Sequence, residues 1–189
     1  ADVFKRHDSD ELENTLSTGA TMTTPPLVPA MGVLPSPWIF FRALVASLIA
    51  YALFHFGFAY FNNPLLLPGL IVIGSFAVPF SVLLLFFEIN TPRNVSLVRV
   101  TQFLIVGGVL SILLSLFIFR LSALNQLFGA PSAGIVEECG KLAIVVLMLK
   151  FIPAHRYPYR LNALLLGAAV GTGFAAFESA GYALVHGAE

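Results

Sequence analysis

The sequence predicts an all-α, polytopic membrane protein, a transmembrane helical bundle with about five spans. Of its 189 residues, 58% are apolar and only 11% are charged, whereas an average globular chain carries about 25% charged residues. The mean hydropathy is +0.88, and seven of the twenty charged residues precede Trp38. A water-soluble domain of this size could not bury so much apolar surface, so soluble protein classes are excluded.

The N-terminal segment differs from the rest of the chain. Residues 1–24 are polar and contain an acidic run, and five prolines lie between Pro25 and Pro37. Such a segment has little apolar surface to bury and resists helix formation. We therefore expect residues 1–37 to be a disordered, proline-rich arm and residues 38–189 to be the transmembrane helical bundle.

Five apolar segments follow the arm, and each is close to the ~20 residues that a helix needs to cross ~30 Å of hydrocarbon. Polar, proline-containing turns at residues 62–64, 90–92 and 153–158 separate several of them. Pro68 and Pro79 are expected to bend the second segment. The expected spans are about 38–61, 65–87, 97–119, 132–152 and 161–186.

The basic residues predict the orientation of the bundle, because Lys and Arg favour cytoplasmic flanks. Eight of them flank one side, only Arg120 flanks the other, and Lys141 lies inside a span, so we expect a cytoplasmic N-terminus. Glu189 then lies just past the opposite face, which suggests a chain truncated at its C-terminus. The eight basic residues are Lys5, Arg6, Arg42, Arg93, Arg99, Lys150, Arg156 and Arg160.

The balance of charge also bears on partners. Ten basic and ten acidic residues give no net charge, so there is no basic footprint for nucleic acid. The expected surroundings are the lipid bilayer, together with a membrane-protein substrate or a larger membrane complex.

Four charged residues lie deep within the expected spans: Glu137, Glu138 and Lys141 in the fourth, and Glu178 in the fifth. Each costs roughly 2.5–3.5 kcal/mol on insertion scales, so buried charges are functional candidates. At ~1.5 Å per residue, Glu138 and Glu178 lie roughly 18 Å and 25 Å from the cytoplasmic ends of their helices. The short connection between these helices predicts antiparallel neighbours, which would bring the three carboxylates together.

The small residues of the fifth span predict how it packs. Gly167 and Gly171 form a GxxxG step, with further small residues on the same face. Such faces allow helices to approach closely in membranes. We expect this face to contact the neighbouring helix.

Two kinds of chemistry are open to such a cluster. Carboxyl groups that lie close together in a medium of low dielectric have different pKa values, so one can hold a proton while another activates water. Alternatively, Glu138 and Glu178 could bind a divalent metal such as zinc, with His55 or His186 as further candidate ligands. A structural interpretation also stays open. Glu137 and Glu138 lie near the start of a helix, where the positive end of the helix dipole stabilises acidic side chains, and Lys141 could balance their charge.

The sequence Glu137-Glu138-x-x-Lys141 resembles the EExxK motif of the PrsW family of intramembrane proteases, part of a CAAX-protease-like superfamily. The glycine-rich segment from Leu161 through Phe174 to Glu178 is similar to that family's second block, a helix that ends in FxxxE. The similarity covers roughly residues 131–186. Two differences are visible, since Ser179 stands where the family usually has Asn, and the family's later histidine motifs are not in this sequence.

The resemblance implies an intramembrane endopeptidase of the bacterial plasma membrane. Glu137 and Glu138 would activate water or bind a metal, Glu178 would be the partner carboxylate, and Glu138 is the first candidate for the base. The substrates implied are membrane-anchored regulators. The alternative is a catalytically silent PrsW-like accessory subunit of a larger membrane assembly, such as a respiratory or export complex. A carrier with a protonatable carboxylate pair is a third possibility, although the sequence shows no inverted repeat.

Overall fold

The computed structural model describes residue 11, residues 38–122, residue 129, residues 131–153 and residues 155–186. Within these ranges every assigned element is a helix, so the all-α prediction is confirmed. The predicted disordered arm, residues 1–37, lies outside the described residues except for Glu11. The arm and its boundary at residue 37 therefore stay a prediction.

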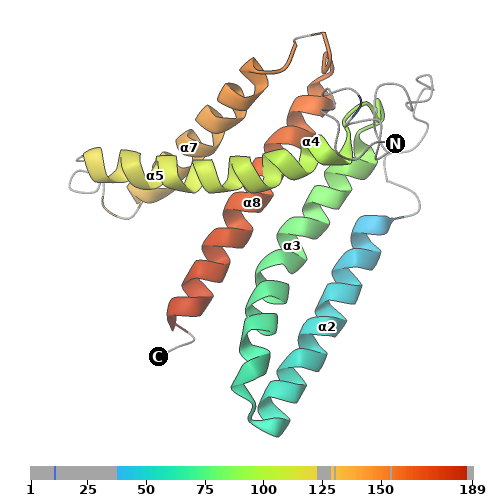
Figure 1. Ribbon diagram of the computed structural model, residues 1–189, viewed down its shortest axis with the longest axis vertical. Coiled ribbons are helices and arrows are strands. Elements are labelled where there is room, and N and C mark those ends of the chain that lie inside the picture. The colour runs from blue at the N-terminus through green and yellow to red at the C-terminus, as the bar shows by residue number, and fades with distance from the viewer. Residues whose placement is uncertain (1–10, 12–37, 123–128, 130, 154, 187–189) are drawn as a thin grey trace.

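The first two long helices form an antiparallel hairpin (Figure 1). Helix α2 (Ile39–Phe61) is joined to α3 (Leu67–Ile89) by the short 3-10 helix η1 (Pro64–Leu66). Asn62 ends α2 in the left-handed conformation, with φ 48°, which Asn tolerates better than most residues. Asn63 Oδ1 accepts a hydrogen bond of 3.0 Å from Leu65 N. The predicted Asn-Asn-Pro turn is therefore present.

A carboxylate holds the other end of this hairpin. Glu88, near the end of α3, accepts hydrogen bonds from Ile39 N (2.8 Å to Oε1) and Phe40 N (3.0 Å to Oε2). The first N–H groups of a helix have no partner within the helix, and an anion at that end is favoured by the helix dipole. Glu88 thus caps α2, a role that the sequence analysis did not assign.

The remaining helices complete the bundle. Helix α4 (Leu97–Gln102), the π-helical segment η2 (Phe103–Gly107) and α5 (Gly108–Leu121) follow one another without a break. They are followed by α7 (Pro131–Lys150) and α8 (Arg160–His186). Figure 1 shows that α5 crosses α8 at a steep angle, instead of running alongside it as a simple up-and-down bundle would require.

All five predicted apolar segments form helices, and four of the described helices are long and apolar enough to cross a membrane: Ile39–Phe61, Pro64–Ile89, Leu97–Leu121 and Arg160–His186. Helix α7 extends over 20 residues, but its three interior charges, Glu137, Glu138 and Lys141, make it less apolar. A transmembrane bundle of about five helices therefore describes the structure.

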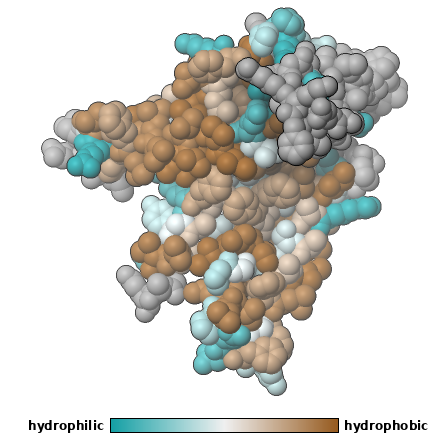
Figure 2. Space-filling view, in the orientation of Figure 1, coloured by the Kyte–Doolittle hydropathy of each residue, from teal (hydrophilic) through white to brown (hydrophobic). Residues whose placement is uncertain are grey.

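The described surface is largely apolar. Helix α2 contains no buried residue, although it is among the most hydrophobic segments, and large apolar side chains such as Phe56 and Leu53 are more than half exposed. Figure 2 shows hydrophobic surface extending over α5 and over the lower part of the molecule. Apolar surface of this extent is matched by lipid rather than by water.

Helix α8 packs most extensively against α3, then against η2 and α5, and less against α7. The predicted contact between α7 and α8 is therefore present, but it is smaller than the contacts of α8 with α3, η2 and α5. Thr172 Oγ1 of α8 donates a hydrogen bond of 3.1 Å to the Pro79 carbonyl of α3. Helix α7 packs mainly on α5.

The closest backbone approach in α8 is at Gly173. A Cβ atom on Gly173 would meet the Leu104 carbonyl oxygen, and one on Gly108 would lie 2.7 Å from Gly173 Cα. By contrast, Cβ atoms on Gly167 and Gly171 would have nothing within 4 Å. The predicted close contact at Gly167 and Gly171 was wrong, because the backbones of α5 and α8 approach each other at Gly173 instead; Thr172, from the same predicted face, is buried.

Three asparagines form a buried cluster that joins the α3–α4 connection to the start of α8. Asn162 is fully buried, and its Nδ2 donates to Asn94 Oδ1 at 2.6 Å and to Asn90 Oδ1 at 3.1 Å. Asn94 Nδ2 donates in return to Asn162 Oδ1 at 3.2 Å. Buried amides are tolerated where they satisfy one another in this way.

Replacing Asn162 with Ala is expected to destabilise the fold by about 1–3 kcal/mol, because Asn90 and Asn94 would lose a buried partner. Thermal unfolding in detergent, followed by circular dichroism, measures this loss. In a double-mutant cycle with Asn94→Ala, the two losses should be clearly less than additive. Fully additive losses would show that the two amides do not act as a pair.

Candidate active site

A cavity of about 200 Å³ lies between α5, α7 and α8, and two of the predicted glutamates line it. Glu137 comes from α7 and Glu178 from α8. The structure therefore brings together two carboxylates that are far apart in the sequence. The other lining residues are Ile112, Ser115, Leu116, Phe119, Ala133, Val136, Phe174 and Tyr182.

Helix α7 directs Glu137 into this cavity because of its buried stripe. Ser132, Val136, Gly140 and Ile144 recur every four residues and are buried against the neighbouring helices. Such spacing places them on one face. Glu137 is half-buried at the margin of this stripe, where its side chain reaches the cavity wall.

Helix α8 places Glu178 near the lower limit of its buried face. Residues from Asn162 to Ala176 supply that face, and Phe177 holds this part of the helix against α3 through an edge contact with Phe76 (ring centroids 5.9 Å apart). Glu178 is half-buried and lies within electrostatic range of Glu137 and Lys141. The cavity thus holds two acidic groups with a cation nearby.

Lys141 is the cation of the site. Its Nζ lies 2.7 Å from Glu138 Oε1 and 4.0 Å from the centre of the Phe174 ring. A cation over an aromatic face is stabilised by the ring quadrupole. The lysine is mostly buried, with a side chain 20% exposed, so its charge acts close to the cavity.

Glu138 is placed differently from Glu137. Its side chain is 75% exposed, it pairs with Lys141, and it does not line the cavity. Adjacent residues on a helix point about 100° apart, so only one of the two glutamates can face α5 and α8. The structure thus brings Glu137 and Glu178 together and leaves Glu138 at the rim.

The structure also adds Ser115, which the sequence analysis did not select. This α5 residue lines the cavity beside the two carboxylates and is 5% exposed. A signal was present in the sequence, because Ser111 and Ser115 lie four residues apart in a largely apolar helix. Small polar residues with this spacing often mark a helix contact in membranes.

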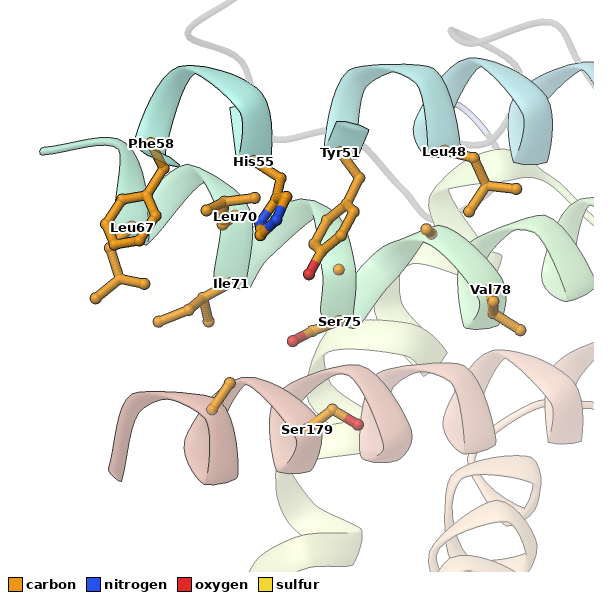
Figure 3. Close-up of a pocket in the computed structure, with 13 residues that line it drawn as sticks. Leu48, Tyr51, His55, Phe58, Leu67, Leu70, Ile71, Ser75, Val78 and Ser179 are labelled. Carbon is orange, nitrogen blue, oxygen red and sulfur yellow. The ribbon is translucent and has the colours of Figure 1, made fainter. Parts of the chain in front are cut away.

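The two candidate histidines lie away from these carboxylates. His55 lines a separate cavity of about 610 Å³ between α2, α3 and α8, where its ring stacks on Tyr51 with centroids 6.3 Å apart. Figure 3 shows His55 and Tyr51 extending from α2, with Ser75 on α3 and Ser179 on α8. His186 lies two turns beyond Glu178 and stacks on Tyr182.

The predicted metal ligands are therefore not gathered into one set. Among the described residues, no group of three or more His, Cys, Asp or Glu side chains is arranged to hold a metal ion. Catalytic zinc sites usually have three protein ligands, whereas this cavity has two carboxylates. The described side chains of this cavity do not by themselves fit a zinc ion.

Comparison with known proteins adds an independent observation. A family model described as PrsW family intramembrane metalloprotease matches residues 91–189, just over half of the chain. The matched segment contains α4, η2, α5, α7 and α8, and so every helix that lines the carboxylate cavity. No curated protein and no solved structure matches the chain.

Proposed function

The chain belongs to the PrsW family of intramembrane metalloproteases, and on that premise we propose that it hydrolyses peptide bonds of membrane-anchored proteins with water activated between Glu137 and Glu178. The observation that carries the proposal is the meeting of these two carboxylates, from α7 and α8, in one cavity. As a member of this family the protein is an integral membrane protein, with the lipid bilayer as its environment. We further place it in the bacterial plasma membrane with a cytoplasmic N-terminus.

The two carboxyl groups take different roles in this proposal. Two acidic groups that share a site of low dielectric do not both ionise readily, so one retains a proton. Glu137 precedes Lys141 by one helical turn on α7. Glu178 lies on α8, within electrostatic range of both Glu137 and Lys141. We assign the role of base to Glu137 and the role of acid to Glu178.

The reaction then balances with these residues alone. Glu137 accepts a proton from water as the water oxygen forms a bond to the scissile carbonyl carbon. Glu178 donates its proton to the amide nitrogen as the carbon–nitrogen bond breaks. The products are a carboxylic acid and an amine, and transfer of one proton from Glu137 to Glu178 restores the starting state. Glu138 takes no proton in this scheme and keeps Lys141 beside the cavity.

The test is cleavage by the purified chain in proteoliposomes. The substrates are single-pass membrane proteins that carry a different fluorescent tag at each end, and mass spectrometry of the fragments locates the cut. We expect fragments whose new termini lie within or next to the hydrophobic segment. The accessory-subunit alternative predicts no fragments, together with stoichiometric co-purification with larger membrane proteins.

A further inference from the structure

The Ser115 hydroxyl is buried without a partner in the part of the chain that the structure describes. Its Oγ is inaccessible to solvent and makes no hydrogen bond, and the whole residue is 5% exposed. Nearly all buried polar groups in native proteins are hydrogen-bonded, so each exception calls for an explanation. One explanation is a ligand or water that binds during function.

Ser111, one turn earlier on α5, shows that the helix could have satisfied this hydroxyl locally. Ser111 is fully buried, and its Oγ donates a hydrogen bond of 2.8 Å to the Gly108 carbonyl three residues before it. Serines in membrane helices commonly bond to such carbonyls. Ser115 lies in the same helix without making this bond, so its hydroxyl is not committed to a carbonyl of α5.

The position of Ser115 relates the hydroxyl to the reacting groups. The residue lines the cavity that contains Glu137 and Glu178. Its Oγ lies against Gly140 of α7, where the Cβ of any other residue would collide with it. Gly140 follows Glu137 by three positions and shares its side of α7. The missing side chain at Gly140 thus makes room for a hydroxyl next to the base.

We propose that Ser115 is a further catalytic residue, whose hydroxyl orients the attacking water. One hydrogen of the attacking water bonds to the Glu137 carboxylate. The other bonds to Ser115 Oγ, which turns about the Cα–Cβ bond from Gly140 into the cavity to receive it, so that a lone pair of the water oxygen points toward the substrate carbonyl. Fixing a nucleophile in this way lowers the entropic part of the barrier. This proposal rests on the proposed function and adds a third contact to the two carboxylates.

Ser115→Ala, with Ser111→Ala as the matched control, tests the proposal through turnover and stability. For Ser115→Ala we expect kcat for the tagged reporter to fall at least about tenfold, KM to stay within about twofold, and the thermal midpoint to be unchanged or higher, because a partnerless hydroxyl is removed. For Ser111→Ala we expect a lower midpoint, because a hydrogen bond is lost, with kcat per folded molecule within about twofold.

A second pair of variants approaches the hydroxyl from the other helix. Gly140→Ala should lower kcat as Ser115→Ala does, because the new methyl group displaces Ser115 Oγ. Gly134→Ala, on the same helix, is the control: its Cβ would have nothing within 4 Å, and we expect it to keep the wild-type kcat.

An unchanged kcat in Ser115→Ala overturns the proposal. A thermal midpoint of Ser115→Ala that falls as far as that of Ser111→Ala also overturns it, and this measurement does not depend on an active enzyme. If Glu137→Gln and Glu178→Gln abolish cleavage and Ser115→Ala does not, only the role of Ser115 fails. If the Gln variants also cleave, the proposed function itself fails.

Discussion

Replacing Glu137 or Glu178 with Gln is expected to lower kcat by about 10²- to 10⁴-fold, the range that general acid–base groups contribute. Glutamine has nearly the shape of glutamate but neither accepts a proton as a base nor donates one as an acid. Both residues are half-buried at the cavity, so the amide keeps the packing. Single-turnover cleavage of the tagged reporter in proteoliposomes measures the effect, and circular dichroism and thermal unfolding establish that the variants fold.

Glu138→Gln is the matched control, because it changes the adjacent residue of the same helix. Since Glu138 lies outside the cavity lining and pairs with Lys141 at 2.7 Å, we expect its loss to reduce kcat by less than about tenfold. A greater loss in Glu138→Gln than in Glu137→Gln would assign the base to Glu138, as the sequence had indicated. Undiminished cleavage in all three variants would contradict a glutamate mechanism.

Replacing Gly173 with Ala is expected to cause the largest loss of stability, at or above the upper end of the roughly 1–3 kcal/mol typical of overpacking. The new Cβ would meet the Leu104 carbonyl oxygen and lie 3.0 Å from Gly108 Cα. These are backbone atoms, which cannot turn aside as a side chain can, so α8 and η2 would have to separate. Thermal unfolding in detergent and the yield of folded protein measure the loss.

Gly171→Ala provides the matched control two residues earlier on α8. Its Cβ would have nothing within 4 Å, and Ala is favoured over Gly in a helix by about 1 kcal/mol. We therefore expect this variant to be as stable as the wild type or more stable. If Gly171→Ala were destabilised as much as Gly173→Ala, the loss could not be attributed to the crossing with η2.

The helices could be predicted because the signals for them are local. Apolar length indicated each helix, and the Asn-Asn-Pro turn marked the end of α2 at Phe61. Their arrangement could not be predicted in the same way. The steep crossing of α5 over α8 depends on Gly108 and Gly173 meeting backbone to backbone, and nothing in the sequence distinguishes this pair from Gly167 and Gly171.

The candidate site could likewise be predicted from the sequence only in part. Glu137 and Glu178 could be selected because charges are costly inside a membrane span. Which of two adjacent glutamates faces the cavity depends on the rotation of α7, which packing on α5 decides. Ser115 carries no charge and costs little to insert, so it becomes conspicuous only when its hydroxyl is found buried without a partner.

The cap that Glu88 places on α2 has a consequence for how the first hairpin sits in the bilayer. Helix α2 has no fully buried residue within the described structure, but it packs closely on α3, where a Cβ atom on Gly69 would collide with the Phe54 ring. The two hydrogen bonds from Ile39 and Phe40 to Glu88, together with the tight turn around Asn63 at the far end, tether both ends of α2 to α3. The depth of α2 in the membrane is thus set by α3, and the two helices enter and settle as one unit.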